Sequence, residues 1–115
     1  MKKEYPMAID NSLYDSIENT YKKIQNYLDT TQLGKEHSAM IIKQEELSEL
    51  LEQLDIEAIE EQWTDINVLH EKLNDIKEDS NQIAEALELS DDSITIADKV
   101  VTGLDKIFSK IAKIL

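Results

Sequence analysis

The sequence predicts an all-α protein, built as a mostly antiparallel bundle of three or four helices. Residues 35–89 contain no proline and no glycine and are rich in Glu, Leu and Ile. Within this run the apolar residues recur every three or four positions, which is the period of one face of an α-helix. The whole chain has only two glycines and one proline in 115 residues. These observations indicate one helical domain over residues 1–115.

The clearest pattern lies in the second half of that run. Alternating steps of three and four residues connect a series of positions there, and only Gln62 and Ser80 among them are polar. This spacing lets two helices interdigitate, so we expect the stripe to form the inner face of the bundle. A self-associating, extended coiled-coil third helix is the alternative. We call these positions the apolar seam: Ile59, Gln62, Ile66, Leu69, Leu73, Ile76, Ser80, Ile83 and Leu87.

The first half of the run carries the same spacing on a different helix face. At about 100° per residue, the stripe through Leu47 and Leu54 points nearly opposite to the stripe through Ile59 and Trp63. A helix break near Asp55 resolves the conflict, because an aspartate there can accept hydrogen bonds from the backbone and begin a new helix. A continuous helix that changes its buried face midway is the alternative, and the sequence leaves both open.

The remaining boundaries come from turn and capping residues. Asn11 or Ser12 can cap a first helix, and Gly34 can close the loop after it. Gly103 lies inside the last helix, where glycine costs about 1 kcal/mol relative to alanine, so we expect a kink or a close approach of another backbone there. The expected helices span residues 11–32, 36–54, 56–89 and 92–115, after a flexible lead-in over residues 1–10.

Composition argues against several classes of function. The chain has no cysteine, only two histidines and no arginine, and its formal net charge is −13. Without arginine, and with this charge, we expect no nucleic-acid binding. No apolar stretch reaches the length of a membrane span and no secretory signal opens the chain, so we expect a cytoplasmic protein without membrane association. We expect no cofactor.

The excess negative charge lies entirely on the central stretch. Residues 36–89 hold sixteen acidic residues against Lys43, Lys72 and Lys77, whereas acids and lysines balance on either side. A solvated helix surface is one interpretation. The other is a docking surface, which would make the chain an acidic inhibitor or decoy for a basic partner, including an imitation of the nucleic-acid backbone.

Carboxylates spaced along two neighbouring predicted helices suggest a divalent-metal site. Glu46 and Glu49 form a Glu-x-x-Glu pair, and Glu61 and Asp65 follow on the next helix. These residues resemble the all-α nucleotide pyrophosphohydrolases of the MazG and dimeric dUTPase type, in which two such helices hold magnesium against a triphosphate. The match covers about 20 residues, and it consists of the spacing of the carboxylates that would bind magnesium. It departs at the second pair: Gln62 and Asp65 have the right spacing but the wrong first residue, whereas Glu61 and Asp65 are one residue too far apart. No cluster of arginines or lysines follows to bind phosphate.

A small four-helix domain with a histidine also resembles the histidine phosphotransfer modules. Their phosphorylated histidine is followed by a Lys-Gly pair, whereas Ser38, Ala39 and Met40 follow His37 here. His70 follows Leu69 of the apolar seam directly in the sequence, so we expect it at the boundary of the buried face.

The function that the sequence favours is a non-enzymatic protein–protein interaction module, an oligomerising or adaptor-type bundle. Four amphipathic helices supply more apolar surface than a short first helix covers, so part of it should pack against a protein partner or a second copy. The residues expected to meet this partner are Ile59, Trp63, Ile66, Leu69, Leu73, Ile76, Ile83, Leu87, Leu104, Phe108 and Ile111.

Overall fold

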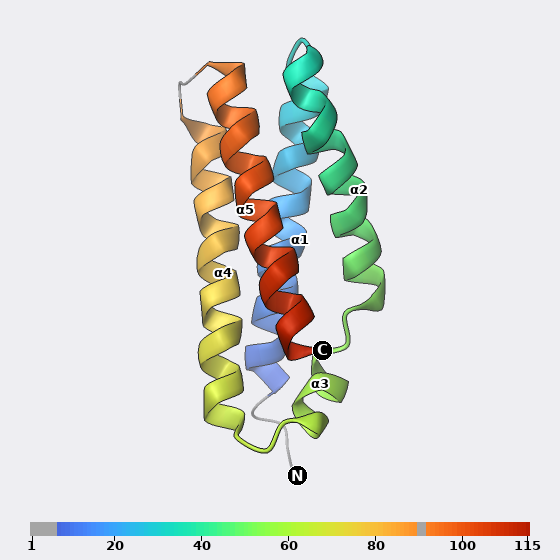
Figure 1. Ribbon diagram of the computed structural model, residues 1–115, viewed down its shortest axis with the longest axis vertical. Coiled ribbons are helices and arrows are strands. Elements are labelled where there is room, and N and C mark those ends of the chain that lie inside the picture. Colours follow the sequence, from blue (N-terminus) through green and yellow to red (C-terminus); the bar gives the residue numbers. More distant parts are fainter. Residues whose placement is uncertain (1–6, 90–91) are drawn as a thin grey trace.

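The predicted all-α fold is confirmed by a computed structural model, which describes residues 7–89 and 92–115. Within these residues the regular structure is entirely helical. Five α-helices and one short 3₁₀ helix, η1, follow one another (Figure 1): α1 Met7–Thr30, η1 Lys35–His37, α2 Ser38–Gln53, α3 Ile56–Gln62, α4 Ile66–Glu88 and α5 Ser93–Ile114.

The chain is elongated, with extents of 50 × 24 × 21 Å, and its four long helices form a bundle along the longest axis. In Figure 1, α4 and α2 flank α5, with α1 behind; α1 and α4 run upward, and α2 and α5 run downward. Each long helix packs on two others, since α4 contacts α1 and α5, and α2 contacts the same two helices. Consecutive long helices are therefore antiparallel, while the neighbours α1 and α4, and likewise α2 and α5, are parallel.

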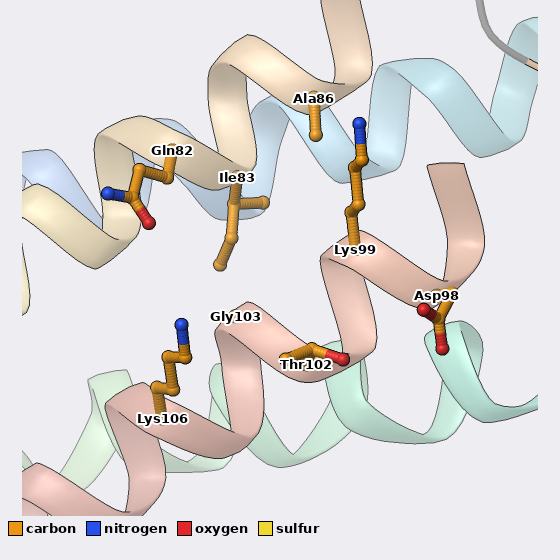
Figure 2. A pocket seen from close by; sticks show the side chains of 8 residues that line it. All are labelled: Gln82, Ile83, Ala86, Asp98, Lys99, Thr102, Gly103 and Lys106. Atoms are coloured by element: carbon orange, nitrogen blue, oxygen red, sulfur yellow. The ribbon is translucent and has the colours of Figure 1, made fainter. Parts of the chain in front are cut away.

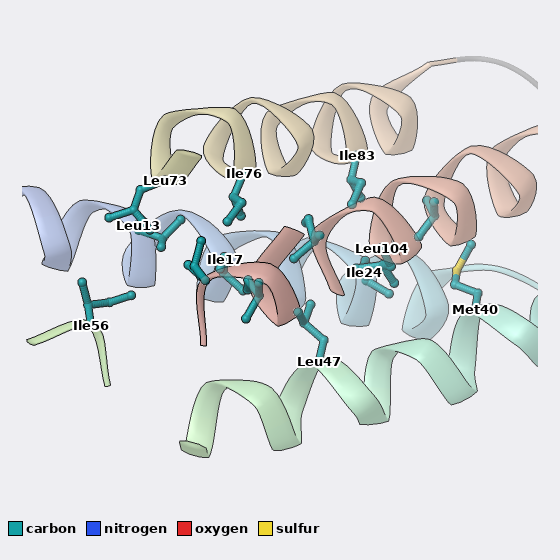
Figure 3. Packing of buried hydrophobic residues seen from close by; sticks show 14 of the residues in the cluster. Leu13, Ile17, Ile24, Met40, Leu47, Ile56, Leu73, Ile76, Ile83 and Leu104 are labelled. Atoms are coloured by element: carbon teal, nitrogen blue, oxygen red, sulfur yellow. The ribbon is translucent and has the colours of Figure 1, made fainter. Parts of the chain in front are cut away.

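The core fills the space between these helices. Figure 3 shows Leu13, Ile17 and Ile24 of α1 facing side chains of α4, α5 and α2. Fully burying a Leu or Ile side chain stabilises the fold by roughly 1.5–3 kcal/mol. The largest fully buried side chains are Leu13, Ile17, Ile24, Met40, Leu47, Leu69, Leu73, Ile76, Ile83, Leu104, Ile107 and Ile111.

The predicted break at Asp55 is confirmed. Helix α2 ends at Gln53, and Leu54 has an extended backbone. The Asp55 side chain then accepts a hydrogen bond from the Ala58 backbone N–H at 3.0 Å and caps α3. The break lets Leu47 and Ile59 both enter the core, which one straight helix could not achieve.

The single third helix expected over residues 56–89 is wrong, because a second break divides it. Helix α3 ends at Gln62, and the Asp65 carboxylate caps α4 by accepting from the N–H groups of Asn67 and Val68 at 3.1 and 3.3 Å. The three- and four-residue spacing of the apolar seam continues across this break in the sequence. The pattern therefore gave no sign that the helix ends there. Helix α4 packs along α1 and α5 and does not project as an arm (Figure 1).

The first helix begins earlier than expected. Residues 7–10 belong to α1, although they were assigned to the flexible lead-in. The rest of that predicted lead-in, residues 1–6, lies outside the described part of the chain. The last helix begins with Asp92 as its cap, whose carboxylate accepts from the Thr95 N–H at 2.8 Å.

Ser80, one of the two polar members of the apolar seam, joins α4 to α1. Its side chain and that of Thr20 are both buried, and the two hydroxyls contact each other. Ser80 Oγ also donates to the Ser16 backbone oxygen at 3.0 Å. A small hydroxyl at this position lets the two parallel helices approach while its polar atom stays satisfied.

Gly103 marks a close approach between α5 and α4, but the neighbour is a side chain and not a backbone. A Cβ atom on Gly103 would lie 2.5 Å from Cγ1 of Ile83. The missing side chain is therefore what lets Ile83 reach the core without displacing α5.

We predict that Gly103→Ala lowers the free energy of unfolding by about 1–3 kcal/mol, because Ile83 must move to admit the methyl group. This loss should exceed the gain in helix propensity of about 1 kcal/mol. Urea unfolding measures the difference, and Thr102→Ala, at the neighbouring exposed position, should have little effect. Equal or greater stability of the Gly103→Ala protein would contradict the tight contact.

Candidate interaction surfaces

Most residues expected to meet a partner are buried within this one chain. Ile66 is 39 % exposed, and Trp63, Leu87 and Phe108 are half-buried. The seven that lie in the core are Ile59, Leu69, Leu73, Ile76, Ile83, Leu104 and Ile111. Apart from Gln62 and Ile66, which are exposed, the apolar seam is thus covered by the other helices of its own bundle. The surplus of apolar surface expected from the sequence is largely buried there.

Trp63 anchors the link between α3 and α4 to the end of α5. Its indole N–H donates a hydrogen bond of 3.1 Å to the Ile114 backbone oxygen. The ring also packs against the edge of the core. An indole that is partly buried and bonded in this way ties two parts of the chain together.

The carboxylates of the pyrophosphohydrolase resemblance do not converge. Glu46 and Glu49 lie on the exposed face of α2, whereas Asp65 caps α4. Glu60 Oε2 lies 3.0 Å from Nε2 of His70. Within residues 7–89 and 92–115, no group of three or more His, Cys, Asp or Glu side chains could hold a metal ion.

His37 is enclosed by the loop between α1 and α2. The Gly34 N–H donates to Nδ1 at 3.0 Å, which leaves the ring proton on Nε2, 3.1 Å from the hydroxyl of Tyr27. The imidazole is fully buried. Both nitrogens therefore serve the local fold, whereas a phosphotransfer histidine must expose its ring.

The same loop is tied to α5 by Glu36. The Ser93 hydroxyl donates a hydrogen bond to Glu36 Oε2. This bond is the main reason that the pKa of Glu36 lies below its ordinary value. It joins η1 to the first residue of α5 across the upper end of the bundle.

The outer face of α2 carries one apolar residue followed, along the helix, by a row of three carboxylates. We call Ile42, Glu45, Glu49 and Glu52 the acidic row; all four are exposed, and Ile42 is 58 % exposed. Its glutamates form no ion pair with any described residue; the adjacent Glu46 lies 3.8 Å from Lys43. Like charges three or four residues apart destabilise a helix by roughly 0.2–0.5 kcal/mol per pair. The glutamates of the acidic row therefore repel one another, and no ion pair within the described residues offsets this repulsion.

A row of lysines lies on α5, along the edge that faces α4. We call Lys106, Lys110 and Lys113 the lysine row. Lys106 and Lys113 form no ion pair within the described residues, whereas Lys110 Nζ lies 2.7 Å from Oδ2 of the buried Asp79. That oxygen makes no well-aligned hydrogen bond, so the attraction of the two charges is what compensates its burial. A hollow lies between α4 and α5 at this point. It is lined by Lys72 and Asp75 of α4 and by Lys110 and Lys113 of α5.

The lysine row leads into a second hollow where α5 has a glycine. Its volume is about 260 Å³, and Ile83, Ala86 and Gly103 supply its apolar part. Figure 2 shows Lys99 and Lys106 on either side of Gly103, reaching toward α4. This surface was not predicted from the sequence. The spacing of the lysines at 106, 110 and 113 was the available signal, but only the fold places the hollow beside them.

Fold and surface together define an all-α helical bundle with charged rows of opposite sign on its exterior. No known protein-family model, curated protein or solved structure significantly matches the chain. In the part of the chain that the structure describes, no helix has both the length and the apolar character that crossing a membrane requires.

The hydrogen bond from Ser93 predicts a pH dependence of stability. Because the folded state holds the pKa of Glu36 down, its ionisation stabilises the protein above the usual glutamate pKa, and this contribution is lost as the pH falls through the lowered value. Ser93→Ala should therefore make the acid loss of stability less steep, as measured by urea unfolding from neutral to acidic pH.

Glu36→Gln is the matched control, because it removes the titrating group itself and should give a similarly reduced slope. Glu88 and Asp92 also have lowered pKa values, owing to Lys23 and to the hydrogen bonds from Thr95, so both variants keep part of the acid sensitivity. An unchanged slope in Ser93→Ala would contradict the role of this hydrogen bond.

Proposed function

We propose that the chain is a non-enzymatic protein–protein interaction module that binds helical partners through charged rows on its outer faces. The observation that carries this proposal is the pair of rows on α2 and α5, which have opposite signs and retain unpaired charges. The proposal includes a cytoplasmic setting, with which a chain lacking cysteine is compatible.

Burial of the apolar seam favours charged contacts over an apolar interface. With Leu69, Leu73 and Ile76 inside the bundle, the exposed apolar residues are scattered, several of them near helix ends. Among the described side chains, the large exposed apolar ones are Leu33, Ile42, Ile66, Val68, Leu89, Ile94 and Leu115. Single exposed apolar side chains are normal on a soluble surface and do not by themselves indicate an interface.

A basic helix would relieve the repulsion along the acidic row. Exposed ion pairs contribute about 0.2–1 kcal/mol each, so three of them give weak binding, specific mainly through their geometry. The same surface would serve an acidic inhibitor of a basic partner, which is the second candidate function. The two differ in the partner, not in the residues that bind it.

We predict that a fluorescent helical peptide binds α2 when its lysines follow steps of four and three residues. Replacing Glu45, Glu49 and Glu52 by Gln should weaken binding by about tenfold, from the loss of three exposed ion pairs. Fluorescence anisotropy measures the affinity, which should also fall as salt rises, because exposed charges are screened.

Glu71, Glu78 and Glu85 on the exposed face of α4 provide the matched control. Their triple replacement by Gln removes the same net charge, and it should leave most of the binding intact. A peptide of equal composition with scrambled lysine spacing should bind less tightly. If both triple variants weaken binding equally, only the net charge attracts the peptide, and the proposed surface is wrong.

A further inference from the structure

We infer that the lysine row and its hollow receive the acidic row of a second copy of this chain. The inference rests on the proposed function, since it names the partner of the two charged rows. Three features of the molecule support it: the matching spacing of the rows, the hollow at Gly103, and the direction in which α2 and α5 run.

The two rows have the same spacing along their helices. Ile42, Glu45, Glu49 and Glu52 are separated by steps of three, four and three residues. The same steps separate Gly103 from Lys106, Lys110 and Lys113. At a rise of 1.5 Å per residue, both rows are about 15 Å long. In a parallel pairing, each glutamate of one copy therefore meets a lysine of the other.

The hollow provides a place for the one apolar member of the acidic row. In the parallel register, Ile42 of the second copy lies opposite Gly103, where α5 has no side chain. The hollow there, of about 260 Å³, has Ile83 and Ala86 on its apolar wall (Figure 2). Ile83 and Ala86 are already buried, so the gain from this contact is that the Ile42 side chain, 58 % exposed in the single chain, leaves water.

The direction of the helices sets the arrangement of the two copies. Within one chain, α2 and α5 are already parallel neighbours, and α4 lies on the other side of α5 (Figure 1). The lysine row is on the α4 side. A second α2 placed there, parallel to α5, puts the two bundles side by side with their long axes parallel.

This contact joins two different surfaces, so it is head-to-tail. One copy contributes its lysine row and the other its acidic row, and each keeps one row unused. Such a heterologous contact continues to further copies, either into a ring or into an open chain.

The net charge of the chain gives the association an unusual salt dependence. Two copies with a formal charge of −13 each repel one another over distances beyond 10 Å, which low concentrations of salt already screen. The contact pairs between the rows act at shorter range and are weakened at higher salt. Self-association should therefore be strongest at intermediate ionic strength.

Sedimentation velocity over a range of protein and salt concentrations tests the inference on the full chain. We expect the wild-type protein to associate weakly and reversibly, with a maximum at intermediate salt. Glu45→Lys with Glu52→Lys should abolish the association, and so should Lys106→Glu with Lys113→Glu. Lys110 is left unchanged in these variants because it compensates the buried Asp79.

The matched controls change the same charges elsewhere on exposed positions. Glu71→Lys with Glu85→Lys adds as much positive charge as the change in the acidic row, and Lys22→Glu with Lys35→Glu adds as much negative charge as the change in the lysine row. The controls should keep most of the association. Thermal unfolding should show that all these variants remain folded.

Combining the two row changes provides the decisive comparison. The fourfold variant has the same net charge as the wild type, and its reversed pairs are again complementary, so self-association should return. A mixture of the two double variants should associate although neither does so alone, with the two chains alternating, because each row of one variant is complementary to a row of the other. Ile42→Ser should weaken the wild-type association without changing any charge.

The inference is overturned if the wild-type chain stays monomeric at every salt concentration, or if the fourfold variant fails to associate where the wild type does. Binding of the lysine peptide separates this outcome from failure of the proposed function. If the chain binds the peptide through its acidic row yet never self-associates, the interaction surface stands and the second copy is not its partner.

Discussion

Burial of the apolar face of α4 between α1 and α5 is the constraint on which the rest of the structure depends. Leu69, Leu73, Ile76 and Ile83 are all essentially inaccessible to solvent, and each contributes roughly 1.5–3 kcal/mol by leaving water. Their burial requires close contact on both sides of α4. A serine and a threonine provide it toward α1, and Gly103 provides it toward α5. The fold thus depends on small residues placed opposite large ones.

This packing also decides which surfaces remain for partners. The apolar face of α4 is buried inside one chain from Leu69 onward, so the exterior is left with charged side chains and isolated apolar ones. Helix α5 is the clearest example. It contributes side chains to the core, makes the close contact with α4 at Gly103, and carries the lysine row on its surface. Gly103 belongs to both of the last two, since the absence of a side chain admits Ile83 and also leaves the hollow at the surface.

The sequence predicted the helical class and the break at Asp55, since both depend on local patterns: apolar period and a capping side chain. It did not predict the break at Asp65. The steps of three and four continue through Gln62 and Ile66, although both side chains are exposed in the structure, and such a period does not show whether the backbone is continuous. For the same reason Leu69 and Ile83 were assigned to a partner. A stripe that packs in its own chain and one that packs on another chain have the same pattern.

The sequence by itself determined that the chain is helical, strongly acidic in its middle and interrupted at Asp55. These properties follow from local propensity, hydrogen bonding of caps and charge, which act between residues close in the chain. Only the tertiary structure decided that α4 lies between α1 and α5, that His37 is enclosed, and that the lysines of α5 stand beside a hollow. Most of these outcomes depend on contacts between residues far apart in the chain, such as Ile83 with Gly103 or Trp63 with Ile114. Such pairs are chosen by how the helices fit together in space.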